Sequence, residues 1–89
     1  MSDKSILYID DETSLLQIMS HALEKRGYEV ATASSGESGL QIFNEIKPNV
    51  VVTDIMMEGI SGIEVLKQVK KERPDTVVIA LTGYGTMDT

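Results

Sequence analysis

Short apolar runs alternate with longer segments of helical period along the chain, and this alternation constrains the fold more than any other feature. The apolar runs are residues 6–9, 28–32, 50–53 and 77–82. The segments of helical period are residues 13–26, 36–46 and 62–72. All of the runs except the second are apolar almost throughout, which is typical of strands covered on both faces of a parallel sheet.

This βαβαβαβ order predicts an α/β fold with a doubly wound parallel sheet and right-handed crossovers. The 89 residues are expected to form one domain, residues 1–89. Strand order is not contained in the pattern, and the flavodoxin-like order 2-1-3-4 is the natural expectation. The run 77–82 would then form an edge, although it has the composition of an interior strand. Because an apolar edge can pair with another chain, we expect self-association through residues 77–82, unless further chain covers them.

The composition of the chain limits the kinds of ligand and the cellular location that we expect for it. The formal net charge is −6, which disfavours direct binding of nucleic acid. No apolar run approaches the roughly 20 residues of a membrane span. The N-terminal residues 1–4 lack the features of a secretory signal, and there is no cysteine for a disulfide framework. A cytoplasmic location is therefore expected, and a cation is a more natural ligand than an anion.

Candidate functional residues follow the predicted strands directly. Asp10 and Asp11 follow the first run, Asp54 follows the third, and Thr82 closes the fourth. The carboxyl ends of parallel strands meet at one edge of a sheet, where ligands bind in open α/β folds. Carboxylates brought that close repel one another unless they share protons or bind a cation. A divalent ion with oxygen ligands, Mg²⁺ above all, would meet this requirement.

Each of these residues also has a purely structural interpretation. Asp10, Asp11 and Glu12 could cap the next helix, since acidic side chains suit its N-terminus. Asp54 could form a turn, and Thr82 could be an ordinary strand residue. The combination of acids after two strands favours a site over these separate interpretations.

Three strings in the chain resemble the receiver domain of two-component response regulators, the CheY-like family. They are Ile6-Leu7-Tyr8-Ile9-Asp10-Asp11-Glu12, Val51-Val52-Thr53-Asp54-Ile55-Met56-Met57 and Ala80-Leu81-Thr82-Gly83. They occur in the family's order and at similar separations, and the resemblance runs from about residue 4 to the last residue.

The resemblance implies a role for each candidate residue. Asp54 would be the phosphoacceptor, taking a phosphoryl group from a sensor histidine kinase or a small molecule such as acetyl phosphate. Asp10, Asp11, Asp54 and the backbone carbonyl of Met56 would bind Mg²⁺. Thr82 would donate a hydrogen bond to the phosphoryl group and move when it arrives. The chain would thus be a signalling module that switches conformation, and not a conventional turnover enzyme.

The sequence departs from the family pattern at two places. Glu58 stands where relatives usually have proline, which removes a fixed φ and adds a negative charge near the site, with an outward-facing side chain expected. The family's fifth strand, its lysine and the last helices have no counterpart in these 89 residues. The resemblance is therefore to a receiver that is incomplete at its C-terminus.

Two other functions are compatible with parts of the sequence. The string Asp10-Asp11-Glu12-Thr13 is faintly similar to the nucleophile loop of haloacid-dehalogenase-like phosphatases, but Glu12 occupies the place of that family's second aspartate. A receiver-like module that is not phosphorylated and acts in interaction or dimerisation is the stronger alternative. His21 has no acidic partner at helical spacing on the core side and is expected on the surface.

Overall fold

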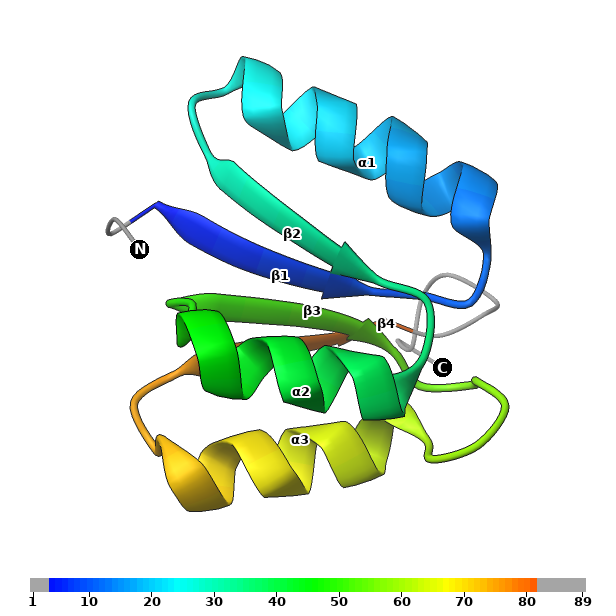
Figure 1. Cartoon of the computed structure of the whole chain (residues 1–89), viewed down its shortest axis with the longest axis vertical. Helices are drawn as coiled ribbons and strands as arrows, with labels where there is room; N and C mark the ends of the chain where they lie inside the picture. Colours follow the sequence, from blue (N-terminus) through cyan, green and yellow to red (C-terminus); the bar gives the residue numbers. More distant parts are fainter. Residues whose placement is uncertain (1–3, 82–89) are drawn as a thin grey trace, which may run out of the picture.

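The computed structural model describes residues 4–81 and contains four strands and three helices in strict alternation (Figure 1). The elements are β1 (Ser5–Ile9), α1 (Thr13–Lys25), β2 (Glu29–Ala33), α2 (Gly36–Ile46), β3 (Val50–Asp54), α3 (Gly62–Glu72) and β4 (Val77–Leu81). Every element predicted from the sequence is present, with boundaries that differ by at most one residue. The predicted end of the fourth strand, Thr82, lies outside the described residues.

The four strands form one parallel sheet in the order β2-β1-β3-β4, which confirms the flavodoxin-like arrangement. Helix α1 lies on one face of the sheet, whereas α2 and α3 lie side by side on the other (Figure 1). Strands β1 and β3 are neighbours, with Ile9 beside Thr53. All four strands therefore point their carboxyl ends toward one edge of the sheet, called here the carboxyl edge; the opposite side is the amino edge.

The main core lies between the sheet and the pair α2 and α3. All five residues of β1 are buried, because this strand is central and covered on both faces. Phe43 of α2 and Val65 and Val69 of α3 pack with Leu7, Ile9 and Val51 of the sheet. Burial of each such side chain contributes about 1.5–3 kcal/mol to the free energy of unfolding. This core fixes the strands that carry the candidate site.

Strand β4 does not have the two covered faces that its composition predicts. Its burial alternates, and Val77, Ile79 and Leu81 are 53%, 46% and 37% exposed. Among the described elements, α1 contacts β1 and β2 only, so it covers one half of its face of the sheet. Val78, on the opposite face, packs against the core beneath α3. Within residues 4–81, β4 is thus covered on one face only.

The buried faces of two helices leave several of their apolar residues exposed. In α3 the buried residues are Gly62, Val65 and Val69, while Ile63 is 42% exposed. The close approach of Gly62 to the backbone of Asp54 sets this rotation of the helix. In α1 only Leu16 is buried, and Leu15 is 37% exposed, because the helix covers only half of its face of the sheet. Across residues 4–81, no helix has the length and apolar character needed to cross a membrane.

Candidate metal centre at the carboxyl edge

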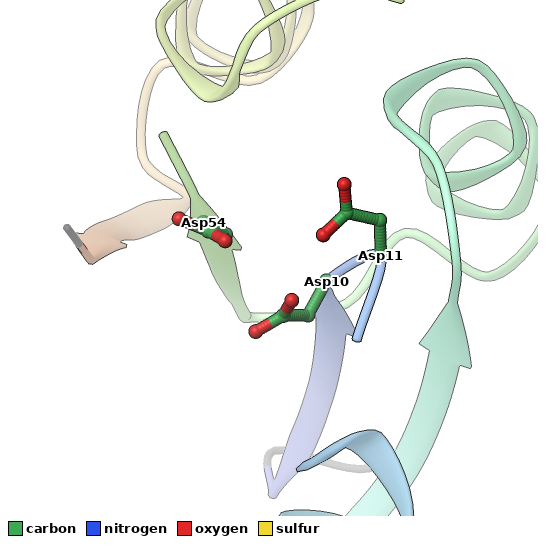
Figure 2. A group of neighbouring side chains, drawn as sticks. All are labelled: Asp10, Asp11 and Asp54. Atoms are coloured by element: carbon green, nitrogen blue, oxygen red, sulfur yellow. The ribbon is translucent and has the colours of Figure 1, made fainter. Parts of the chain in front are cut away.

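The parallel sheet brings the three acidic residues after β1 and at the end of β3 into one group. Figure 2 shows Asp10 and Asp11 at the end of β1 and Asp54 at the end of β3, with their carboxylates around a common space. One carboxylate oxygen from each residue lies within 4.8 Å of those of the other two. The predicted convergence of acids from two strands is confirmed.

Two of the carboxylates are oriented by the same local device. Asp10 Oδ1 accepts a hydrogen bond of 3.0 Å from the backbone N–H of Glu12, and Asp54 Oδ1 accepts one of 3.2 Å from the N–H of Met56. Each bond joins a side chain to the backbone two residues ahead, as in an Asx-turn. A carboxylate has two oxygens and can accept several bonds, so this orientation still permits coordination of a cation.

The helix-capping interpretation of the acidic string is wrong in its simple form. Glu12 occupies the N-cap position of α1, but its side chain makes no capping hydrogen bond. Asp10 instead binds the N–H of Glu12, and its carboxylate is also part of the acidic group. The helices α2 and α3 are capped in the ordinary way by Ser35 and Ser61. Of the three helices that the structure describes, α1 is therefore the one that lacks a hydrogen bond from its N-cap side chain.

Electrostatics makes the acidic group costly without a cation. Asp10 is only 3% exposed, and this burial raises the pKa of its carboxyl. The hydrogen bond from Glu12 opposes the shift, while the charges of Asp54, Asp11 and Glu12 raise the pKa further. Burial and then the charges of Asp10 and Asp54 also raise the pKa of Tyr8. The environment therefore disfavours an additional negative charge.

A hollow of about 310 Å³ opens above the acidic group. It is lined by Asp10, Asp11, Glu12, Ser14, Leu15, Ile18, Asp54 and Leu81. No lysine or arginine is among these described lining residues, so no side chain of the lining supplies the missing positive charge. Three close carboxylates, one of them buried, fit a hard divalent cation with oxygen ligands, as Mg²⁺ is. The chemistry of the donor set thus agrees with the prediction of a magnesium site.

The structure tests the predictions for the other residues only in part. Met56 lies beside Asp54, its side chain is 65% exposed, and its N–H binds the Asp54 carboxylate. A metal bond from its carbonyl stays a prediction. Thr82 lies outside the described residues, so its contact with a phosphoryl group also stays a prediction. Glu58 and His21 are exposed, as expected.

Two glycines shape the site and were not singled out by the sequence reasoning. Gly62 donates its N–H to the carbonyl of Ile55 at 3.0 Å, and a Cβ at this position would collide with the Asp54 carbonyl. Gly59 has a φ of 80°, in the left-handed region that favours glycine. The pairs Glu58-Gly59 and Ser61-Gly62 in a segment between strand and helix were the available signal. These glycines allow α3 to start directly against the end of β3.

The fold and the acidic group together define a flavodoxin-like α/β protein with a carboxylate site at the carboxyl edge of its sheet. Comparison with known proteins gives the family. The family model of the response regulator receiver domain matches residues 6–89, and the chain belongs to this family.

Individual relatives agree with the family assignment. The chain is 34% identical over 88 residues to the photosynthetic apparatus regulatory protein RegA of Rhodobacter capsulatus, covering 99% of this chain and 48% of RegA. It is 39% identical to the alkaline phosphatase synthesis transcriptional regulatory protein PhoP of Bacillus subtilis, covering 91% of this chain and 34% of PhoP. The chain thus spans about half or less of the length of these relatives.

A solved structure, the response regulator protein TrrA of Thermotoga maritima in complex with Mg(2+)-BeF, has a TM-score of 0.86 and 40% identity, over 91% of this chain and 70% of that one. A chain in the structure of the histidine kinase ThkA in complex with TrrA has a TM-score of 0.88 and 37% identity, over 97% of this chain and 74% of that one.

Proposed function

We propose that this protein is a phosphoacceptor module of a two-component system, in which Asp54 takes a phosphoryl group in a reaction that requires Mg²⁺. The observation that carries the proposal is the placement of carboxylate oxygens from Asp10, Asp11 and Asp54 within 4.8 Å of one another. The similarity to TrrA, which was solved with Mg(2+)-BeF, supports the same chemistry here. The proposed donor is a sensor histidine kinase, supported by the similarity to a chain of the ThkA–TrrA complex.

The proposed reaction is an in-line transfer to a carboxylate oxygen of Asp54. A new O–P bond forms, the P–N bond of the donor phosphohistidine breaks, and the released imidazole nitrogen takes a proton from solvent. Mg²⁺ bound at the site would neutralise charge on the attacking carboxylate and on the phosphoryl oxygens. Asp10 and Asp11 would hold the metal beside Asp54, with the carbonyl of Met56 as a further ligand.

The residues around Asp54 favour this role over a purely structural one. The N–H of Met56 fixes one carboxylate oxygen of Asp54, which reduces the orientational freedom lost on reaction. Asp54 is half-buried at the end of β3 and lines the hollow, so it combines a fixed backbone with access to a donor. The acyl phosphate adds negative charge and acceptor oxygens at the carboxyl edge. Thr82 would donate a hydrogen bond to one of these oxygens and bias a two-state loop.

The module would act by being modified once and not by turning over a substrate. It would work in the cytoplasm, without direct contact to nucleic acid, in keeping with its net charge of −6. The alternative, an interaction module that is never phosphorylated, finds support in the apolar edge strand β4. The two functions differ in a single measurable property, the acceptance of a phosphoryl group.

Incubation with acetyl phosphate and Mg²⁺ followed by intact mass measurement tests the proposal. We expect the wild-type chain to gain the mass of one phosphoryl group, and to lose this gain when a chelator removes Mg²⁺. Asp54→Asn should abolish the gain, whereas Asp75→Asn, which removes an exposed acid at the amino edge, should keep it. No gain in the folded wild-type chain, or an equal gain in Asp54→Asn, would overturn the assignment of Asp54. Continuous release of phosphate from esters would instead indicate a phosphatase.

A further inference from the structure

The loop between β3 and α3, residues 55–61, is held mainly by side-chain packing. Its two ends are joined by a hydrogen bond from the N–H of Gly62 to the carbonyl of Ile55. In the part of the chain that the structure describes, residues 57–60 make no hydrogen bond between backbone groups. The side chain of Ile60 instead packs against the core. The conformation of this loop, called here the β3–α3 loop, therefore depends on what that side chain contacts.

Ile60 lies against the first turn of α2, at Gly36. A Cβ on Gly36 would collide with Cγ1 of Ile60 and would lie 2.9 Å from its Cδ1. Figure 1 shows the β3–α3 loop beside the start of α2. Gly36 is buried, so the Ile60 side chain fills the space that any larger residue at position 36 would need. The close approach of the loop to α2 requires glycine at this position.

The β3–α3 loop also carries the backbone group that orients Asp54. The N–H of Met56 donates to Asp54 Oδ1 at 3.2 Å, and the carbonyl of Met56 is a proposed metal ligand. Met56 and Ile60 lie in the same short loop, and the residues between them have no backbone bonds to absorb a displacement. A shift of Ile60 should therefore reach the backbone of Met56.

A side chain at position 36 would displace Ile60 and not α3. The nearest atom of α3 is Cγ2 of Val65, which would lie 3.1 Å from the added Cβ. Val65 is fully buried in the close-packed core and has no free space to move into. Isoleucine is β-branched and stiff at χ1, so a collision with its Cγ1 is not relieved by turning the end of the side chain alone. The loop is the softer of the two neighbours.

We propose that Gly36 and Ile60 are positioning residues for the metal centre. Their contact fixes the β3–α3 loop, and through it the backbone of Met56, in the conformation that binds Mg²⁺. Neither residue lines the hollow above the carboxylates, so the start of α2 sets the metal affinity without supplying a ligand. This inference rests on the proposed function, because it concerns the same magnesium site.

Gly39 offers a matched control in the same helix. A Cβ on Gly39 would collide with Cδ1 of Ile9 and would lie 2.8 Å from its Cγ1. Gly39→Ala therefore also crowds α2 against a neighbour. Ile9, however, lies in β1 between two paired strands, and the nearest atom is the free end of its side chain. Gly39→Ala should crowd the core and leave the β3–α3 loop in place.

Titration of Mg²⁺ by isothermal calorimetry tests the proposal, with circular dichroism confirming that each variant is folded. Gly36→Ala should weaken binding about 10-fold, the lower end of the effect of losing a residue that supports a metal ligand. Gly39→Ala should bind nearly as tightly as the wild type. Unchanged affinity in Gly36→Ala, or an equal loss in both variants, overturns the positioning role alone. A wild-type chain that does not bind Mg²⁺ overturns the proposed function as well.

A second variant, Ile60→Ala, releases the loop without crowding anything, and it keeps the test available if Gly36→Ala does not fold. It should also weaken Mg²⁺ binding about 10-fold. In the double variant the added methyl at position 36 has room, because Cγ1 and Cδ1 of Ile60 are gone. The double variant should therefore bind Mg²⁺ as tightly as Ile60→Ala alone. Unchanged affinity in folded Ile60→Ala, or a double loss equal to the product of the single losses, overturns the proposal.

Amide NMR spectra of the metal-free protein supply a readout that does not depend on Mg²⁺. The signal of the Met56 N–H should shift in Gly36→Ala, because the loop that carries its hydrogen bond to Asp54 is displaced. The same signal should stay in place in Gly39→Ala. A Met56 signal that does not move in Gly36→Ala, or that moves equally in both variants, overturns the transmission of the contact along the loop.

Discussion

The polar groups at the two edges of the sheet differ in how they are paired. At the amino edge, Ser5 is fully buried and donates to Asn49 Oδ1 at 2.8 Å, while its Oγ accepts from the N–H of Asn49 at 3.0 Å. Arg73 donates to the carbonyl of Lys47 at 2.7 Å. At the carboxyl edge, by contrast, three carboxylates share one small volume, and the hollow above them has no basic residue in its described lining.

This contrast separates the edge whose polar groups stabilise the fold from the edge that we propose binds a cation. Bonds such as the Ser5–Asn49 pair connect residues far apart in sequence and hold the start of β1 to the start of β3. The carboxylates at the other edge instead repel one another, and together with burial this raises the pKa of Asp10. Functional sites commonly carry such a cost, since binding needs groups that folding alone would not place together. A substitution at one edge can therefore be compared with a matched substitution at the other.

The largest expected effect is the loss of metal binding at the carboxyl edge. Asp10→Asn and Asp11→Asn should each weaken Mg²⁺ binding by at least about 100-fold, because each removes a charged oxygen ligand, whereas loss of a supporting residue costs about 10–100-fold. Titration of Mg²⁺ by isothermal calorimetry measures this. Asp75→Asn, at the amino edge, removes the same charge and should change the affinity little. Similar losses in all three variants would mean that net charge, and not coordination, attracts the ion.

The second effect lies at the amino edge. Ser5→Ala should lower the free energy of unfolding by about 2 kcal/mol, because it removes the two hydrogen bonds between the buried Ser5 hydroxyl and Asn49, each of which contributes about 1 kcal/mol. Urea denaturation measures the change. Mg²⁺ affinity should stay as in the wild type, since Ser5 lies at the opposite end of β1. A Ser5→Ala variant of unchanged stability would show that the amino edge does not carry the structural role assigned to it here.

Much of the fold and of the candidate site could be predicted from the sequence, because both depend on where the strands begin and end. Apolar runs that alternate with helical stripes leave few topologies other than a parallel sheet, and the end of a strand fixes where the next residue lies. Asp10, Asp11 and Asp54 could therefore be grouped without coordinates. Strand order required the choice of a known arrangement, because nothing in the pattern of runs states which strands pair.

Other features depend on contacts that no local pattern contains. Val77, Ile79 and Leu81 have the composition of a buried strand, yet they are exposed, because α1 covers only β1 and β2. The rotation of α3 follows from the approach of Gly62 to Asp54, which is a tertiary contact. The same holds for the bond between Ser5 and Asn49, 44 residues apart. Such details are set by packing and not by periodicity.

A smaller effect on the stability of the metal-free protein should appear when a negative charge is removed from the carboxyl edge. Asp10→Asn should raise the free energy of unfolding of the metal-free protein at neutral pH by about 1 kcal/mol, a common gain for a single stabilising substitution. Asparagine keeps an oxygen that can accept the Glu12 N–H and removes the repulsion from Asp54 and Asp11. Urea denaturation with a chelator present measures it. A loss of stability would show that the charge of Asp10 is satisfied within the protein.

The smallest effect is the pH dependence of the stability that Asp10→Asn adds to the metal-free protein. Because burial and neighbouring charges raise the pKa of Asp10, the folded state holds a proton at pH values where the unfolded residue, with a pKa of about 3.9, has lost it. The contribution of Asp10 to stability is therefore fully present below about pH 4 and is lost as the pH rises through the pKa of the folded state.

The stability difference between Asp10→Asn and the wild type should accordingly be smallest at acidic pH and grow as the pH rises. Urea denaturation across a pH series, with Mg²⁺ chelated, measures this difference. Saturating Mg²⁺ should reverse its sign at neutral pH, because the wild type binds the ion far more tightly than the variant and a ligand stabilises the state that binds it. A difference that is constant with pH would contradict the raised pKa, whereas a sign that Mg²⁺ does not reverse would count against coordination by Asp10.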